Sequence, residues 1–209
     1  MRDRLLTLNP FSCHFPLNTD NSRVTDRTLV AIREHCQRLM SLDLTRANRL
    51  SAEGLITLFI DVSLDAIPDI NSTSYSTPTK IGLLEKVYLS GLDAVTDDVI
   101  EQLCLSSAGG NTGLTHLDIS SCPNVTGKSA LLLLDHCADS LQDLNVSFVR
   151  QISEAALGTL IEACKDIQRL EVWGCSQLTS KFFGCGFNGV VRVEGEVKRD
   201  GARVLGVGV

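Results

Sequence analysis

Apolar residues recur along this chain in a fixed order. Each copy of the order begins with Leu-x-x-Leu-x-Leu, in which Val or Ile can replace Leu. It continues after two residues with a small or apolar residue and ends on an aliphatic residue followed by Ser or Thr. The clearest copy runs through Leu114, Leu117, Ile119, Cys122 and Val125 to Thr126. The other copies begin at Leu39, Leu84, Leu141 and Ile167. The opening residues of each copy alternate between apolar and polar, which predicts a short strand.

The Ser or Thr that closes each copy is placed to cap a helix. Ser153, for example, is followed by Glu154, and a carboxylate in the first turn favours the positive end of the helix dipole. The residues that follow, such as Leu157, Leu160 and Ile161, have the spacing of an apolar helix face. Each copy is therefore predicted to form a strand, a turn and a helix.

The spacing of the copies indicates the fold class. Their first residues, numbered 39, 84, 114, 141 and 167, are separated by 45, 30, 27 and 26 residues. The last three intervals lie at or close to the roughly 20–29 residues of a leucine-rich repeat. We therefore expect an α/β leucine-rich-repeat solenoid of five or six units, a right-handed horseshoe with parallel strands on its concave face and helices on its convex face. Such a fold works by presenting a surface, so we expect a non-enzymatic protein.

The predicted solenoid covers residues 1–183 and begins with an irregular unit over residues 1–38. In this unit we expect Leu6 and Leu8 in a strand and Val24-Thr25-Asp26 in the turn before a helix, with an insertion around residues 13–23 between them. The long first interval contains residues 67–80, which are rich in Ser, Thr, Pro and Asn. This composition predicts a loop insertion. A degenerate extra repeat is the alternative.

Residues 184–209 abandon the pattern and are rich in glycine. Residues 190–193 and 203–205 have the composition of strands, so this segment is predicted to be a capping hairpin over the open edge of the last repeat. A disordered tail is the alternative. Its glycines at 184, 186 and 189 match Gly-x-Gly-x-x-Gly, but they lack the preceding strand and following helix of a dinucleotide site. A nucleotide-binding enzyme is therefore only a remote alternative.

The charge and the hydropathy of the chain limit the classes of partner that it can bind. The formal net charge is −6 and the pI is near 5.2, which argues against direct nucleic-acid binding through a basic stripe. No apolar run reaches the roughly 20 residues that span a bilayer. Asn9 and Pro10 interrupt the apolar start of the chain, unlike the core of a signal peptide. We expect a protein of the cytoplasm, the nucleus or both that does not bind membranes.

The chain has eight cysteines, and the repeat explains most of them without a metal or cofactor. Cys122 and Cys175 occupy the position that Ala47, Leu92 and Val149 fill in the other copies. A position that accepts these residues is an apolar packing site, where free cysteine acts as a small hydrophobic residue. No Cys-x-x-Cys is present, so no zinc cluster is predicted. Inward packing at helix ends is expected for Cys36, Cys137 and Cys164.

The residues between the leucines should face outward on the strand side, because alternate side chains of a strand point to opposite faces. Their central row is Asp43, Tyr88, Asp118, Asn145 and Glu171. Aromatic side chains among charges are typical of binding hot spots, and an acidic row favours a partner with a basic or hydrogen-bond-donating surface. Packing of Trp173 under the C-terminal segment is the alternative for that residue. The candidate partner-binding residues are Asp43, Arg46, Lys86, Tyr88, His116, Asp118, Asn145, Phe148, Glu171 and Trp173.

The Leu-x-x-Leu-x-Ile-x-x-Cys-x-x-Val-Thr unit of residues 114–126 resembles the cysteine-containing repeats of F-box/leucine-rich-repeat proteins, and the resemblance covers residues 24–183. Those proteins are substrate receptors of cullin-type ubiquitin ligases. Residues 145–153 and 172–179 look most like the leucine-rich-repeat protein of global-genome nucleotide-excision repair, which also works within a ubiquitin ligase.

The resemblance implies a substrate-recognition or targeting subunit that contacts a ligase adaptor and is a monomer within its complex. The alternative that it implies is a DNA-repair accessory subunit that acts through protein partners. No F-box motif precedes the repeats in this sequence. An adaptor would therefore be recruited by another route, or the chain is a fragment.

Overall fold

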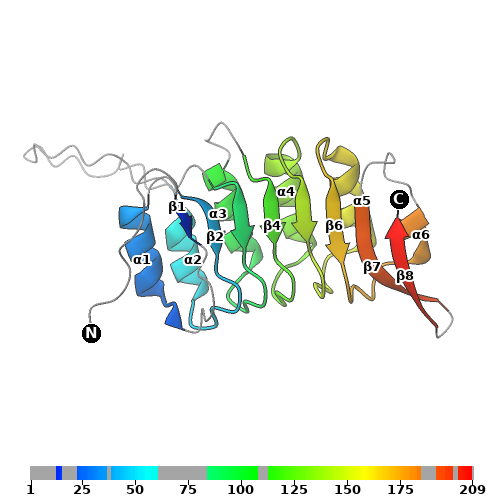
Figure 1. Ribbon diagram of the computed structural model, residues 1–209, viewed down its shortest axis with the longest axis horizontal. Helices are drawn as coiled ribbons and strands as arrows, with labels where there is room; N and C mark the ends of the chain where they lie inside the picture. The colour runs from blue at the N-terminus through cyan, green and yellow to red at the C-terminus, as the bar shows by residue number, and fades with distance from the viewer. Residues whose placement is uncertain are drawn as a thin grey trace, which may run out of the picture.

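The computed structural model describes residues 13–15, 23–36, 39–60, 84–107, 113–184, 192–199 and 202–208. Within these segments, eight strands join one sheet in sequence order, and helices form a second layer behind it (Figure 1). The strands are β1 (Cys13–Phe15), β2 (Leu39–Asp43), β3 (Lys86–Tyr88), β4 (His116–Asp118), β5 (Asp143–Asn145), β6 (Arg169–Val172), β7 (Arg192–Arg199) and β8 (Ala202–Gly208). The helices are α1 (Asp26–His35), α2 (Ala52–Phe59), α3 (Asp97–Ser107), α4 (Gly127–Cys137), α5 (Glu154–Ala163) and α6 (Ser180–Gly184).

The sheet is parallel from β1 to β7, and β8 pairs with β7 in the antiparallel direction. Each unit contributes one strand to the sheet and one helix to the layer behind it. This α/β arrangement is compatible with the leucine-rich-repeat solenoid that the spacing predicts. None of the helices in the described segments is long and apolar enough to cross a membrane.

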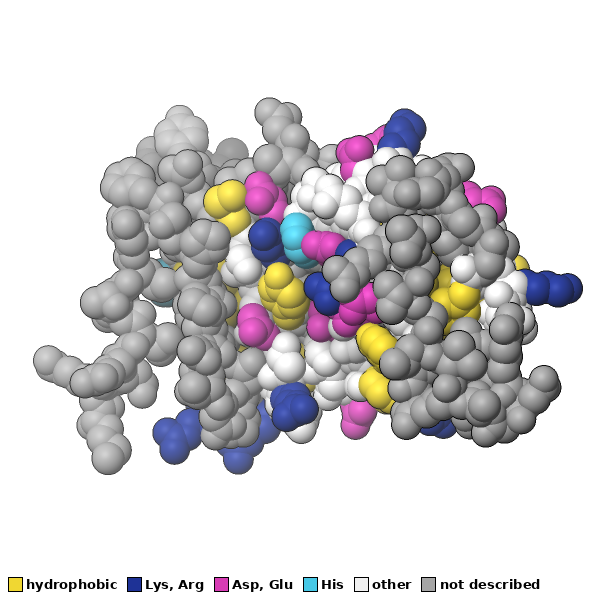
Figure 2. Space-filling view, turned by 45° about the vertical axis from the view of Figure 1, so that its right-hand side comes forward, with side chains coloured by type: hydrophobic (Ala, Val, Ile, Leu, Met, Phe, Trp, Pro, Cys, Tyr) yellow, Lys and Arg dark blue, Asp and Glu magenta, His cyan; other side chains and the backbone are white. Residues whose placement is uncertain are grey.

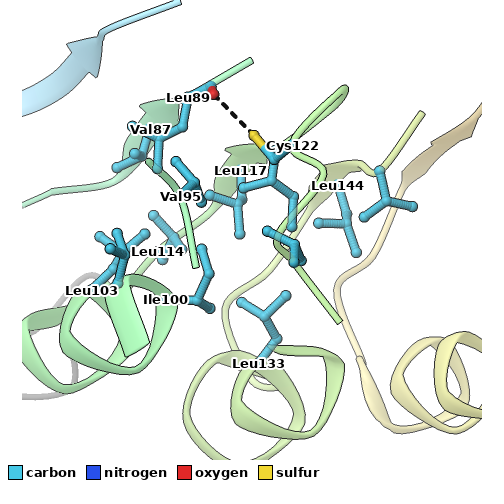
Figure 3. Packing of buried hydrophobic residues seen from close by; sticks show 14 of the residues in the cluster. Val87, Leu89, Val95, Ile100, Leu103, Leu114, Leu117, Cys122, Leu133 and Leu144 are labelled. Carbon is cyan, nitrogen blue, oxygen red and sulfur yellow. Dashed lines mark hydrogen bonds between the residues drawn. The ribbon is translucent and has the colours of Figure 1, made fainter. Parts of the chain in front are cut away.

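The leucine positions of the repeat form one continuous core between the two layers. Leu42, Val87, Leu117, Leu144 and Leu170 are neighbours in the strand register, and each is at most 2% exposed. Figure 3 shows the strand residues of neighbouring units meeting side chains from the helices. Burial of each such side chain stabilises the fold by about 1.5–3 kcal/mol, so the pattern accounts for the stacking of the units.

The cysteines pack in this core, as predicted from the repeat. The six cysteines whose side chains the structure describes, Cys36, Cys104, Cys122, Cys137, Cys164 and Cys175, are all buried. The Cys122 thiol donates to the Leu89 carbonyl oxygen of the preceding unit at 3.2 Å (Figure 3), and Cys175 does the same with Val146 at 3.2 Å. Burial raises the pKa of both Cys122 and Cys164 to about 11. These thiols are therefore protonated at neutral pH. No group of three or more His, Cys, Asp or Glu residues in the described part of the chain is placed to hold a metal ion.

The predicted helix caps are present. The Ser51 hydroxyl accepts the Gly54 N–H at 2.9 Å, and the Ser153 hydroxyl accepts the Ala156 N–H at 3.2 Å. Each bond satisfies an amide that the first turn of a helix leaves without a partner.

Acidic residues at helix starts also join neighbouring units, and we call this contact the clamp. In a clamp, the carboxylate of the first residue of one helix accepts both the backbone N–H and the side-chain O–H of the residue that caps the next helix. Asp26 accepts from Ser51 at 3.0 and 2.9 Å, and Asp97 accepts from Thr126 at 2.9 and 2.6 Å. The third clamp joins Glu154 to Thr179 at 2.6 and 3.0 Å.

The clamp recurs at every second unit. It is formed by α1, α3 and α5, whereas α2 begins with Ala52 and α4 begins with Gly127. In the sequence, the first-turn acids were interpreted only through the helix dipole. Burial raises the pKa of Asp97, but hydrogen bonds from Ser129 and Thr126 outweigh this effect, so its pKa lies below its usual value.

The first unit differs from the sequence prediction. Cys13–Phe15, assigned to the insertion, forms strand β1 and pairs with β2 through Cys13↔Leu39 and Phe15↔Leu42. An edge strand pairs through its backbone groups and needs no leucine pattern to do so, which is why the spacing missed it. The predicted strand residues Leu6 and Leu8 and the insertion at 67–80 lie outside the described residues.

The C-terminal hairpin of β7 and β8 extends the sheet beyond the last repeat. Val193 in β7 is 3% exposed and belongs to the main core. A Cβ atom at Gly195 would lie 2.6 Å from the Val172 Cγ2 atom and 3.2 Å from the Phe183 ring. The backbone of β7 therefore lies close against the last unit and covers the end of its core.

Candidate functional site

The strand register assembles the outward residues into rows that cross the sheet. The first row is Ser41, Lys86, His116, Asp143 and Arg169. The central row is Asp43, Tyr88, Asp118, Asn145 and Glu171, and β7 adds Glu194 to it. A third row, which we call the hydroxyl row, follows the strand ends and consists of Thr45, Ser90, Ser120 and Ser147, with Trp173 in the equivalent place of the last unit. Figure 2 shows acidic, basic and histidine side chains gathered around hydrophobic ones on this face.

Part of the central row has a structural role that the sequence interpretation missed. The Asp43 side chain accepts the Thr45 N–H at 2.9 Å, and Asn145 accepts the Ser147 N–H at 3.0 Å. Asp118 makes the equivalent bond at 2.9 Å. Such local bonds turn the chain at the end of a strand. Three of the five members are thus explained in part by the turn.

The centre of the face carries an excess of negative charge. Arg169 lies 2.9 Å from Glu171 and 3.4 Å from Glu194. Burial raises the pKa of Glu171, Arg169 lowers it, and Glu194, Asp118 and Asp143 raise it further, so its net shift is upward. The pKa of Tyr88 is also raised, first by burial and then by Asp143, Asp43 and Asp118.

His116 lies in this charged region with Asp143, which the pattern places outward but which was outside the candidate set. The two side chains are 2.7 Å apart, from Nε2 to Oδ2. Burial lowers the pKa of His116 more than Asp143 raises it, and Lys86 lowers it further. A small pocket of about 120 Å³ here is lined by this pair and by Tyr88, Asp118 and Arg169.

The residue that follows each member of the hydroxyl row, or Trp173 in the last repeat, has a positive φ. It is glycine at Gly91 (φ 73°) and Gly174 (φ 67°), but Arg46 (φ 60°), Ser121 (φ 56°) and Phe148 (φ 63°) adopt the same conformation. A non-glycine residue in this region costs about 1 kcal/mol or more. The position persists because its N–H donates to the next unit, as Phe148 does to the Trp173 carbonyl oxygen at 2.6 Å. Two candidates, Arg46 and Phe148, therefore lie on these turns.

A groove of about 450 Å³ lies on the strand face at the end nearer the C-terminus. Phe148, Glu171 and Trp173 line it together with Asn145 and the serines of the hydroxyl row. Phe148 is 55% exposed, and its ring lies over Gly174, where a Cβ atom would clash with the ring. The groove therefore unites four of the candidates. Tyr88, His116 and Asp118 line the smaller pocket, whereas Asp43, Arg46 and Lys86 lie on the β2 and β3 units and line neither.

Comparisons with known proteins give information about the fold of this chain. No protein-family model matches the chain, and no curated protein sequence matches it. Among solved structures, a chain of the crystal structure described as the Rad7 and Elc1 complex in yeast is similar to it, with a TM-score of 0.63 and 17% sequence identity. The match covers 90% of this chain and 44% of that one, so this chain spans less than half of its length. The likeness supports a distant leucine-rich-repeat-like fold.

Proposed function

We propose that this chain is a non-enzymatic protein-interaction module that binds a partner protein on its strand face. The observation that carries the proposal is the groove with its two aromatic side chains, which lies beside rows of charged groups on the sheet. Aromatic and charged groups brought together in this way are typical of binding hot spots. In this proposal the sheet lines the concave side of a right-handed horseshoe, where a partner can touch several units at once.

The charge of the face supports a partner with a basic or hydrogen-bond-donating surface. Neighbouring carboxylates contribute to the raised pKa of Glu171 and of Tyr88, which is the effect of a negative potential. A cationic partner would be attracted to such a face, and its association would weaken as salt is added.

At a finer level we propose a substrate-recognition or targeting subunit of a cullin-type ubiquitin ligase, acting in the cytoplasm or nucleus as a monomer within its complex. The resemblance of the cysteine-containing units supports this role. Further support comes from the likeness to a chain that was crystallised in a complex of Rad7 and Elc1. A repair accessory subunit acting through protein partners is the second candidate, because residues 145–153 and 172–179 resemble the excision-repair protein.

Affinity capture from cells tests the interaction surface. We expect a Tyr88→Ser/Glu171→Gln variant to lose partners that the wild-type chain captures. A Leu131→Ser variant on α4 in the helix layer, where Leu131 is 52% exposed, should keep them. Equal melting temperatures of the three proteins would establish that folding is unaffected. Retention of every partner by the face variant would disprove the strand-face proposal.

The partners that are captured distinguish the finer roles. Recovery of a cullin adaptor supports the ligase subunit, whereas recruitment to chromatin only after DNA damage supports the repair subunit. The remote enzyme alternative predicts thermal stabilisation by an adenine dinucleotide that Gly186→Ala abolishes, and this result would contradict a non-enzymatic role.

A further inference from the structure

We propose that the groove beside Phe148 and Trp173 is the binding site for a single arginine side chain from the partner. This inference rests on the proposed function, since it names the chemical group that the strand face recognises. Arginine combines a flat cation that stacks on aromatic rings with five N–H donors. The groove offers two aromatic side chains, a carboxylate and several oxygen acceptors.

The Phe148 side chain is held in place at an energetic cost. Its backbone has a φ of 63°, a region that favours glycine, and the equivalent residue in two other units is glycine. The ring is not in the core, because it is 55% exposed. It rests instead on Gly174, which has no side chain that would push it away. The bond to the next unit explains the turn itself, so the unusual feature is an exposed aromatic ring at a position where two other units have the less strained glycine.

The charge around the groove favours a positively charged occupant. One basic group, Arg169, lowers the pKa of Glu171. Three carboxylates raise it, and they belong to Glu194, Asp118 and Asp143. The Glu171 side chain is 23% exposed and uses Oε1 for Arg169. A carboxylate accepts several hydrogen bonds, so a second guanidinium can bind Glu171 without displacing Arg169. An anionic ligand such as a phosphate would meet repulsion here.

The other lining groups favour arginine over an apolar side chain. Asn145 and serines of the hydroxyl row form the polar part of the groove. The Ser90 and Ser120 hydroxyls bond each other at 2.7 Å and the Ser147 hydroxyl accepts the Trp173 N–H at 3.1 Å, but a hydroxyl can make further hydrogen bonds, which an apolar occupant would not satisfy. The volume of about 450 Å³ lies within the roughly 300–1,000 Å³ of ordinary ligand sites. It therefore accommodates one long side chain with the backbone next to it.

Trp173 makes the inference directly measurable, because it is the only tryptophan of the chain. The probe is an acetylated and amidated Gly-Gly-Arg-Gly-Gly peptide, titrated while the tryptophan emission is followed. Matched peptides carry citrulline, a neutral isostere of arginine, or lysine. We expect a saturable change with the arginine peptide, at least about tenfold tighter binding than with citrulline, and weaker binding as salt is raised.

Two variants test the groove itself. Phe148→Gly removes the ring and relieves the backbone strain, so the protein should stay folded and bind the arginine peptide about tenfold more weakly. Leu131→Ser changes an exposed residue of α4 in the helix layer and lies outside the groove, so its affinity should match the wild type within about twofold. Glu171→Gln should also weaken binding, whereas Glu101→Gln on α3 should not.

Several results would overturn the inference. They are no saturable change in emission, equal affinity for the arginine, lysine and citrulline peptides, or wild-type affinity in Phe148→Gly. If the peptide fails to bind while the Tyr88→Ser/Glu171→Gln variant still loses its cellular partners, the proposed arginine site is wrong and the proposed function stands. If the peptide binds but the variant keeps every partner, the proposed function is wrong.

Discussion

Gly54 and Gly158 both lie within helices, yet they should respond to alanine in opposite ways. A Cβ atom at Gly158 in α5 would meet nothing within 4 Å. Gly158→Ala should therefore raise the free energy of unfolding by about 0.5–1 kcal/mol, the usual helix-propensity gain. At Gly54 in α2 the added atom would clash with the Asp26 carboxylate. Gly54→Ala should therefore lower the free energy of unfolding by about 1–3 kcal/mol, as measured by urea unfolding.

This prediction depends on the clamp between Asp26 and Ser51. The carboxylate can move away from a new methyl group only by giving up its bonds to the Ser51 N–H and O–H. Equal stabilisation by both alanine substitutions would mean that Asp26 moves without loss and that the clamp contributes little.

At the residue scale, the sequence predicted where side chains point better than what they do. The alternation of a strand is a property of its backbone, so the central row could be predicted in full. The turn bonds of Asp43, Asp118 and Asn145 could not be read from alternation, because they join each side chain to an amide two residues later. Recurrence of Asp or Asn two residues before Ser or Thr was the available signal.

At the scale of elements, the clamp of Asp97 should make a measurable contribution to stability. Asp97→Asn removes a charged acceptor of two bonds from Thr126. The free energy of unfolding should fall by about 1–3 kcal/mol at neutral pH. The adjacent Asp98 is the control, because it is 73% exposed and pairs only with Lys128 at 3.2 Å in the described ion pairs. Asp98→Asn should change stability by less than about 1 kcal/mol.

The same clamp should contribute to the acid sensitivity of the fold. The pKa of Asp97 lies below its usual value in the folded protein. Its contribution to stability is therefore present at pH values above the pKa of an unfolded aspartate and is lost as the pH falls through the lower, folded pKa. Between pH 5 and pH 2.5 the Asp97→Asn protein should lose less stability than the wild type, as measured by urea midpoints. Parallel pH curves for the two proteins would contradict this role.

The elements themselves followed from the sequence wherever a unit was regular. Caps such as Ser51 and Ser153 were predictable from local chemistry. The clamps were not, because whether Glu154 reaches Thr179 depends on how two units stack. Strand β1 was missed for a related reason: it is defined by pairing with β2, and its sequence lacks the leucine spacing.

For the whole molecule, stability should be local along the stack of units. Units in a repeat fold contact chiefly their neighbours, so damage at one end should spread only a short way. Val193→Asp places a charge where the side chain is 3% exposed, in the strand that covers the last unit. Hydrogen exchange should accelerate in β6 and α6 and remain slow in β3 and β4. The control is Val30→Asp on α1, where valine is 44% exposed, and exchange in β6 should not change.

A uniform loss of protection across all units would instead show that the chain unfolds in one cooperative step. In that case the C-terminal hairpin would stabilise the entire molecule and not only its last unit.

The alternation of the clamp has a consequence for how such a chain can be lengthened or shortened. The natural module of the chain is a pair of units, a couplet, in which the first helix begins with an acidic residue and the second does not. Copying or deleting a couplet keeps every carboxylate opposite a helix cap that donates to it and preserves the alternation, whereas deleting a single unit would place two helices that begin with an acid next to each other. The long segment at 61–83 enters between α2 and β3, at a boundary between couplets. The boundaries between couplets are therefore the positions at which units can best be inserted or removed.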